Sequence, residues 1–355
     1  MYPHRIRLRG PWTAEPLSHT RLWGDGRHEM VDATVPAAVS MTPPCRWTTA
    51  GLADFSGQVR FRRRFQWVHE LAPFEQLWLC FLGVDYFAEV TLNGHQLGRH
   101  EGAFLPFGFN ITPMVRPSNE LTVVVDCPAL AEPSAAKHLW RSNLSAGGGL
   151  WGTVMLEVRR NVHLQQVQIR PSYHLSTQRG SIAITGQIAG TSEQPLALCM
   201  LMDDREVYYA DLTPDECRTG WQRHVSDLNV QPWSPREIGQ PNGHRIQLKL
   251  LDAASCLDAR DWWLGFREMH SNPNGLWLIN GQATSVAPRL LYLQAPLSEA
   301  PLLDELDQHG VTYLVHQPCA AHVQQGLLAN PEYRRLVKAM DVHLQHRPGF
   351  FGWCQ

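Results

Sequence analysis

The sequence predicts a mainly β protein, with two β-sandwiches followed by a short α/β segment. Two observations predict this class. The 25 prolines and 27 glycines divide the 355 residues into short segments, and no amphipathic helix of useful length occurs before residue 290. Frequent Pro and Gly between short apolar runs are typical of sandwiches rather than helical bundles. A chain of this length is expected to form two or three domains, and we place them at residues 1–160, 161–264 and 265–355.

The first predicted domain contains alternating and continuous apolar runs. Its expected strands cover residues 58–65, 77–83, 89–98, 120–126 and 153–158. Val59 and Phe61 share one face of the first strand, but Arg63 breaks the alternation, which indicates a bulge or a paired charge. Asn93-Gly94 supplies the two positive-φ residues of a type I′ hairpin. This domain is therefore predicted to be an all-β sandwich.

The second predicted domain repeats this pattern with different spacing. Its clearest strands cover residues 164–170, 181–189, 197–202, 205–210 and 245–251. Trp233-Ser-Pro interrupts the chain between two of them. About 100 residues with about seven short strands fit an immunoglobulin-like sandwich.

The third predicted domain changes to mixed α/β character. Asn280-Gly281 predicts another hairpin, Ser298 is placed to cap a short helix, and Asn330 is placed to cap a longer one. Strands are expected at residues 311–316 and 350–354. This alternation is typical of an α/β fold, but the segment is far shorter than the roughly 250 residues of a complete (β/α)₈ barrel.

Composition excludes several classes of function. The formal net charge of -2 leaves no basic footprint for nucleic acid and no polybasic patch for a membrane surface. No apolar run approaches the ~18 residues of a membrane helix, and no secretory signal is visible, so we expect a cytoplasmic protein. The 8 cysteines form no C-x-x-C pair, and the 17 histidines form no H-E-x-x-H motif. We therefore expect no metal and no cofactor.

Several motifs occur in a fixed order along the chain. They are Leu92-Asn-Gly-His-Gln-Leu-Gly, Phe104-Leu-Pro-Phe-Gly-Phe-Asn-Ile-Thr, Gly147-Gly-Gly-Leu-Trp-Gly-Thr-Val, Trp233-Ser-Pro, Gly265-Phe-Arg-Glu and Leu278-Ile-Asn-Gly-Gln. Their order and spacing resemble glycoside hydrolase family 2, the family of β-galactosidases and β-mannosidases. The resemblance implies a galactose-binding-like jelly roll at 1–160, an immunoglobulin-like domain at 161–264 and a partial, TIM-barrel-like (β/α) segment at 265–355.

The resemblance also implies where catalytic carboxylates are expected. In the family, an Asn-Glu pair with the acid/base glutamate follows the strand that resembles residues 350–354, and the nucleophilic glutamate comes later. The sequence reaches Gln355 before either, so we expect a chain that lacks both and name no catalytic residue. Its one Asn-Glu pair, Asn119-Glu120, lies within the jelly-roll motif and is predicted to be a structural turn. Because retaining hydrolysis needs two carboxylates about 5–5.5 Å apart, binding without cleavage is expected.

Candidate sugar contacts lie in one loop and at the last strand. Trp140, Arg141, Asn143 and Trp151 combine aromatic faces with planar hydrogen-bonding groups, and the resemblance implies that their loop approaches the barrel mouth. The alternative is that both tryptophans fill the core between the sheets. Trp353 is a further candidate, with a core role as its alternative. The expected partner is a β-linked saccharide.

Three functions therefore remain open. The first is a carbohydrate-binding or structural protein. The second is the N-terminal part of an active retaining β-glycosidase of the β-mannosidase or β-galactosidase type. The third is a protein-interaction scaffold without sugar affinity. Since an incomplete barrel leaves strand edges unpaired, we also expect a homo-oligomer formed through this segment, or docking of the segment onto the sandwiches.

Overall fold

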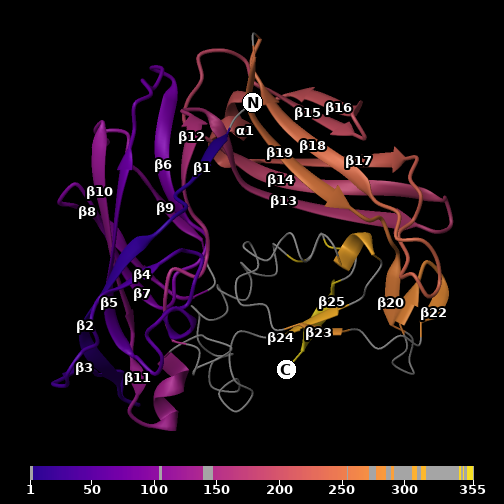
Figure 1. The fold of residues 1–355 in the computed structure, drawn as a ribbon. Helices are drawn as coiled ribbons and strands as arrows, with labels where there is room; N and C mark the ends of the chain where they lie inside the picture. Colours follow the sequence, from indigo (N-terminus) through magenta and orange to yellow (C-terminus); the bar gives the residue numbers. More distant parts are fainter. Residues whose placement is uncertain are drawn as a thin grey trace.

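The computed structural model describes residues 3–103, 106–138, 147–253, 255–271, 277–284, 289–291, 306–309, 313–316, 344, 347 and 350–354. Most of these residues lie in β-strands, which form two sandwiches and two further three-stranded sheets (Figure 1). The predicted mainly β fold is therefore confirmed.

The first sandwich consists of a four-stranded sheet and an eight-stranded sheet, called here the small sheet and the large sheet. The small sheet contains, in spatial order, β1 (His4–Arg7), β12 (Val154–Arg160), β6 (Glu75–Phe81) and β9 (Phe107–Asn110). The large sheet contains, in spatial order, β11 (Ala129–Leu130), β2 (Trp12–Leu22), β5 (Gly57–Gln66), β10 (Ser118–Cys127), β7 (Phe87–Leu92) and β8 (His95–Glu101). The strands that also pair with β2 are β3 (His28–Val31) and β4 (Val39–Met41). Because β1 pairs with β12, the first and last strands of this region close the sandwich together.

Alternation along the strands decides which side chains form the core of the first sandwich. In β5, Val59 and Phe61 are fully buried. Arg60 and Arg62 lie on the opposite face, and both pair there with Glu15. Complete burial of one such apolar side chain stabilises the fold by about 1.5–3 kcal/mol, so this alternation fixes which face of β5 points inward.

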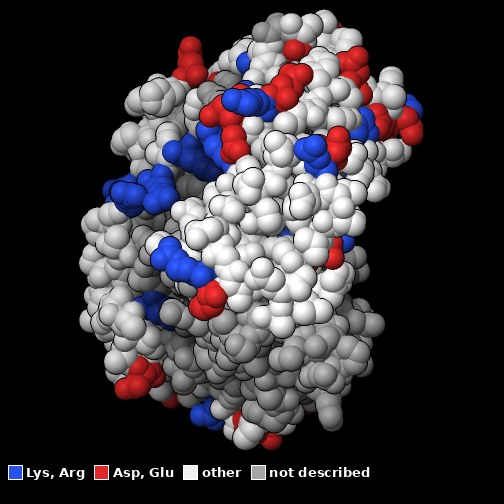
Figure 2. All heavy atoms as spheres, turned by 90° about the vertical axis from the view of Figure 1, so that its right-hand side faces the viewer, with Lys and Arg blue, Asp and Glu red and all other residues white. Residues whose placement is uncertain are grey.

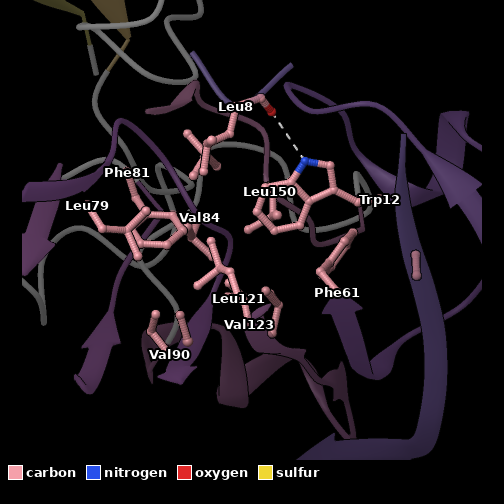
Figure 3. Packing of buried hydrophobic residues seen from close by; sticks show 14 of the residues in the cluster. Leu8, Trp12, Phe61, Leu79, Phe81, Val84, Val90, Leu121, Val123 and Leu150 are labelled. Carbon is pink, nitrogen blue, oxygen red and sulfur yellow. Dashed lines mark hydrogen bonds between the residues drawn. The ribbon is translucent and has the colours of Figure 1, made fainter. Parts of the chain in front are cut away.

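Side chains from both sheets meet in this core. Phe81 of the small sheet and Leu121 of the large sheet both point into it (Figure 3). The indole N–H of the buried Trp12 donates a hydrogen bond to the carbonyl oxygen of Leu8 at 3.3 Å. The Trp12 indole is therefore buried in the core with its N–H donor satisfied.

Arg63 fits into β5 without a bulge. The register of β5 with β10 runs from Gly57 to Gln66 without a shift. The Arg63 guanidinium donates to the carbonyl oxygens of Pro11 and Arg9, at 2.8 Å each. Of the two predictions for this residue the bulge is wrong, and two backbone acceptors hold the charge in place.

The second sandwich packs a three-stranded sheet on a four-stranded one. The first contains β13 (His163–His174), β14 (Arg179–Ala189) and β17 (Trp221–Leu228). The second contains, in spatial order, β16 (Arg205–Asp211), β15 (Ala197–Met202), β18 (His244–Leu251) and β19 (Cys256–Leu264). The five strands expected from the sequence are all present, and β17 and β19 are additional. A six-residue helix, α1 (Pro214–Thr219), begins at a capping box between Thr213 and Glu216.

Two further sheets follow the second sandwich. One is an antiparallel sheet of β20 (Met269–Ser271), β21 (Trp277–Ile279) and β22 (Gln282–Thr284). The other is a parallel sheet of β23 (Arg289–Leu291), β24 (Tyr313–His316) and β25 (Phe350–Cys354). Parallel pairing needs crossover connections, in keeping with the predicted α/β character. The partial barrel and the domain boundaries stay predictions, and the helix expected after Asn330 lies almost entirely outside the described residues.

Both Asn-Gly hairpins form as predicted. Asn93 and Gly94 adopt φ angles of 53° and 83° between β7 and β8, and Asn280 and Gly281 adopt 49° and 78° between β21 and β22. The Asn93 side-chain amide also donates to Oδ1 of the buried Asn119 at 2.9 Å. The Asn-Glu pair thus has a structural role, but the predicted turn is wrong at these residues: both lie in β10, where Asn119 pairs with Phe65 of β5.

Trp233 joins the second sandwich to the later residues. Its fully buried indole donates to the carbonyl oxygen of Asp307 at 2.9 Å. Its own carbonyl accepts a hydrogen bond from the Asn280 side chain at 2.9 Å. The buried Asp307 carboxylate pairs with Arg347 at 3.1 Å. These contacts agree with docking of the C-terminal region onto the sandwiches, whereas the homo-oligomer stays a prediction.

The surface carries both signs of charge. On the face drawn in Figure 2, basic and acidic side chains occur together in the upper part, and the middle is largely uncharged. In the part of the chain that the structure describes, no helix is long and apolar enough to span a membrane.

Candidate functional site

The structure describes one of the five predicted sugar contacts in full. Trp140, Arg141 and Asn143 lie outside the described residues. Trp353 lies in β25, where the backbone but not the side chain is described. Trp151 lies three positions before the first residue of β12 and is described completely.

Trp151 is held firmly within the first sandwich. It is 9% exposed, and its indole N–H donates to the carbonyl oxygen of Ala103 at 3.0 Å. The Arg46 guanidinium lies over the indole, 4.1 Å from the ring centroid. The ring therefore has a structural role as a platform for Arg46, and its contact with a sugar stays a prediction.

A buried ion pair lies beside this ring. Arg46 Nη1 donates to Oδ2 of Asp85 at 2.8 Å and to the carbonyl oxygen of Gly147 at 2.7 Å. The Asp85 side chain is 1% exposed, and its backbone exchanges two hydrogen bonds with Gly149. We call Arg46, Asp85, Trp151 and Gly147–Gly149 the loop-end cluster. It fixes the chain directly after residues 139–146, where three of the candidates lie.

Close packing explains the three consecutive glycines of this cluster. A Cβ on Gly147 would lie 2.3 Å from Cγ2 of Thr48, and one on Gly149 would lie 2.6 Å from the carbonyl oxygen of Cys45. A Cβ on Gly148 would lie 2.4 Å from the Trp47 ring. The run therefore allows close backbone approach. In the sequence one signal points to Asp85, which directly follows the apolar run 77–84, and no comparable signal points to Arg46.

A hollow of about 500 Å³ lies on the outer face of the large sheet. We call it the Asp126 pocket. Its polar and aromatic lining residues are His28, Gln58, Phe87, Glu89, Arg99, His100, Glu101 and Asp126. They come from β3, β5, β7, β8 and β10, and alternation brings all of them except His100 to one face. In β10 Val123 and Val125 are fully buried, so Val124 and Asp126 between and beyond them point outward.

The Asp126 carboxylate forms the floor of this pocket. The residue is 6% exposed, and its Oδ1 accepts a hydrogen bond from the buried Thr20 hydroxyl at 2.6 Å. Its Oδ2 accepts from Gln58 Nε2 at 3.1 Å and lies 3.3 Å from His28 Nε2. The His28 ring is tilted against Phe87, with 5.8 Å between centroids. The floor thus presents acceptors and donors in a fixed arrangement beside an aromatic ring.

The rim of the pocket adds an exposed ion pair, whereas the imidazole of His100, a further lining residue, is turned toward the small sheet. Glu89 and Arg99 pair at 3.1 Å. His100 stacks on Phe107 with 3.9 Å between centroids, and its Nε2 lies 3.0 Å from the carbonyl oxygen of Gly102. Burial lowers the pKa of His100, while the hydrogen bond to Gly102 opposes that shift. The imidazole is therefore neutral near pH 7, and the carboxylates of the pocket outnumber its fixed cations.

This arrangement suits recognition of a polar, uncharged ring compound. Carboxylate, amide and imidazole groups bind neighbouring hydroxyl groups, and the Phe87 ring offers apolar area to a C–H face. The volume lies within the range of small-molecule sites. Within the described ranges, no group of three or more His, Cys, Asp or Glu side chains is arranged to hold a metal ion.

Comparison with known proteins connects the first sandwich to a described family. A family model named glycosyl hydrolase 2 galactose-binding domain-like matches residues 54–162. A β-galactosidase of Lactobacillus delbrueckii subsp. bulgaricus is 26% identical over 204 residues, which is 58% of this chain and 20% of that protein. A β-galactosidase of Thermoanaerobacter pseudethanolicus is 25% identical over 62% of this chain and 30% of its own length. The chain thus spans less than a third of either relative.

Solved structures share the fold over nearly the whole chain. A Bifidobacterium dentium β-glucuronidase aligns with a TM-score of 0.74 and 19% identity, covering 99% of this chain and 67% of that one. A β-D-mannosidase of Dictyoglomus thermophilum aligns with a TM-score of 0.72 and 16% identity, covering 99% of this chain and 50% of that one. At these identities the likeness shows the fold alone.

Proposed function

Because the chain belongs to glycoside hydrolase family 2, as its motifs predict, we propose that its first sandwich binds a β-linked saccharide without cleaving it. The observation that carries this proposal is the Asp126 pocket, where a buried carboxylate, an amide and an imidazole surround a hollow bordered by Phe87. Their positions are fixed by hydrogen bonds within the protein, so little conformational entropy is lost when a ligand binds.

We do not propose that the described residues hydrolyse the glycosidic bond of the saccharide. A retaining glycosidase needs two carboxylates flanking one glycosidic bond. The Asn-Glu pair of the sequence lies in β10 and has structural partners: Asn119 accepts a hydrogen bond from the Arg116 N–H at 2.8 Å, and Glu120 pairs with Arg64 at 2.9 Å. The proposed role is therefore recognition of a saccharide.

The five residues nominated from the sequence define a second location for the same function. Trp140, Arg141, Asn143 and Trp151 would place a sugar beside the loop-end cluster, and Trp353 would extend that site. The ion pair between Arg46 and Asp85 supports it by fixing the flanking chain. Variants at the two locations distinguish them.

An alternative function is the N-terminal part of an active retaining β-glycosidase of the β-mannosidase or β-galactosidase type. One observation favours it: the fold aligns over 99% of this chain with a β-glucuronidase and a β-D-mannosidase. In that case the two sandwiches would support a catalytic barrel and contribute to its substrate site. A scaffold without sugar affinity is the third hypothesis.

Titration calorimetry with methyl β-D-galactoside and methyl β-D-mannoside tests the proposal. We expect saturable binding of at least one sugar, and Phe87→Ala should weaken it about threefold to tenfold. Tyr209→Ala is the matched control, because it removes a ring that is 54% exposed on the second sandwich. Binding that Arg141→Gln weakens and Phe87→Ala leaves unchanged would move the site to the loop.

Two further outcomes overturn the proposal as a whole. Turnover of p-nitrophenyl β-galactoside or β-mannoside by this chain would establish the glycosidase. A lack of binding to any sugar of a glycan array, by protein that unfolds cooperatively, would favour the scaffold.

A further inference from the structure

A second hollow, of about 590 Å³, lies between the two sandwiches. The outer face of the small sheet forms one wall, and residues of β13 and β19 form the other. Figure 1 shows the small sheet on the side of the first sandwich that faces the second. The two walls are joined by a hydrogen bond of 3.2 Å from Arg160 Nη1 to Ser255 Oγ. We call this hollow the inter-sandwich groove. Sites for small molecules occur preferentially at such junctions.

The groove carries an excess of positive charge. Arg5, Arg159 and Arg260 line it, and Glu157 is the one carboxylate among the lining residues. Arg260 is paired with Asp258 at 3.1 Å behind the wall. Arg5 and Arg159 share the single carboxylate of Glu157. Two guanidinium groups on one carboxylate leave a net positive charge where the small sheet faces the groove.

Arg5 keeps most of its hydrogen-bonding capacity available. Its bond to Glu157 Oε2 uses Nε, at 2.7 Å. A guanidinium has five N–H donors, so four remain on the two terminal nitrogens. Among the described residues, these nitrogens meet no protein acceptor. The side chain is 54% exposed, and an anion therefore reaches it without displacing another protein group.

Aromatic rings form the rest of the walls. Trp78 and Phe107 come from the first sandwich, and Trp262 comes from the second. The Arg159 guanidinium lies over the Trp78 ring, 4.6 Å from its centroid, which fixes that side chain. Rings on both walls favour a ligand with a ring of its own between them.

We propose that the inter-sandwich groove binds an acidic ring compound, a carboxylate or sulfate carried on a sugar-sized ring. The anion pairs with Arg5 and Arg159, and the ring lies between the tryptophans of the two walls. Charge separates this site from the Asp126 pocket. There Asp126, Glu89 and Glu101 face the single fixed cation of Arg99, which disfavours an anion. The groove is independent of the proposed function, because the two sites share no residue.

Calorimetric titration with methyl β-D-glucuronide tests this proposal, with methyl β-D-glucoside as the neutral probe of the same ring. The glucuronide should bind the wild-type protein at least about tenfold more tightly than the glucoside. This preference should decline at about 0.5 M NaCl, because salt screens the partly exposed Arg5. Equal affinity for the two probes, or no saturable binding of the glucuronide, overturns the proposal.

Variants then locate the binding. Arg5→Gln should weaken glucuronide binding about tenfold, and it leaves Glu157 paired with Arg159, so the fold is retained. Arg64→Gln is the matched control, since Arg64 is 82% exposed on the large sheet, and it should change nothing. Asp126→Asn should also leave glucuronide affinity unchanged, which separates this site from the neutral one. Glucuronide binding that survives Arg5→Gln, in protein with a wild-type unfolding temperature, contradicts the assignment.

Discussion

The buried carboxylate of Asp126 is the most informative single position in the first sandwich. It accepts hydrogen bonds from Thr20 at 2.6 Å and Gln58 at 3.1 Å, and lies 3.3 Å from His28. Asp126→Ala removes all three interactions and leaves the Thr20 hydroxyl, in a residue that is 2% exposed, without its acceptor. One buried unsatisfied group costs about 1–3 kcal/mol, and the partly exposed partners recover hydration. We therefore expect a loss of about 3 kcal/mol in the free energy of unfolding.

The variant Asp126→Asn tests the negative charge of the carboxylate separately from the shape of the side chain. The amide keeps the volume and one acceptor, which can still serve Thr20, but its NH₂ group then faces the donors of Gln58 and His28. Since Gln58 can rotate its own amide to present Oε1, we expect a smaller loss of about 1–2 kcal/mol. Binding of a neutral β-glycoside should fall about tenfold or more, because the acceptor at the floor is replaced by a donor.

Urea denaturation followed by tryptophan fluorescence measures the first effect, and calorimetry measures the second. Thr20→Val in a double-mutant cycle with Asp126→Ala should show a coupling of about 1–2 kcal/mol. If both Asp126 variants stay within about 0.5 kcal/mol of the wild type, with equal slopes against urea, the carboxylate has no structural partners in solution. The reasoning would then be refuted.

Three other predictions concern the rest of the fold. Burial of Glu157 opposes its ionisation, but Arg159 and Arg5 hold the pKa of that carboxyl below its usual value of 4.5. The pair therefore stabilises the fold fully above that pH and loses its effect as the pH falls through the lowered pKa. Urea midpoints measured from about pH 6 to pH 3 should fall less steeply in Glu157→Gln than in the wild type, and parallel curves would contradict this. Gly148→Ala should destabilise the protein by about 2 kcal/mol or more, because its Cβ would also lie 2.5 Å from the Asp85 carbonyl oxygen; an unchanged urea midpoint would disprove the packing. Burial raises the pKa of the Cys80 thiol to about 11, so iodoacetamide at pH 8 should leave this residue unlabelled until the protein is unfolded, as read by peptide mass spectrometry, and rapid labelling of the native protein would contradict it.

Local patterns in the sequence predicted the elements whose causes are local. The two Asn-Gly turns adopt positive φ at both positions because these residue types tolerate that conformation. The expected strand at 197–202 coincides with β15, and the one at 350–354 with β25. In these segments alternation or an unbroken apolar run is itself the cause of the structure.

Strands whose polar residues find their partners far away in the sequence were not predicted. β19 contains Asp258, Arg260 and Asp261, so its pattern does not alternate cleanly. In the fold Asp258 is 2% exposed and accepts the backbone N–H of Leu164 at 2.9 Å, nearly 100 residues away. No local pattern contains that partner.

The Asp126 pocket was missed for the same reason. Its residues lie at positions 28, 58, 87, 99 and 126, and only the order of strands in the large sheet brings them together. The candidate sugar contacts at residues 140–151, in contrast, could be predicted because Trp140 and Trp151 are close in sequence. A site made of contiguous residues can be predicted from a local sequence pattern. A site on the face of a sheet can be predicted only when the strand order is known.

Crystals of this chain soaked with methyl β-D-galactoside test the central claim most directly. We predict density for one sugar ring in the Asp126 pocket, with a hydroxyl group within hydrogen-bond distance of the Asp126 carboxylate and the ring against Phe87. A sugar bound only beside Trp151, or an empty Asp126 pocket at concentrations that saturate binding in solution, would contradict the account.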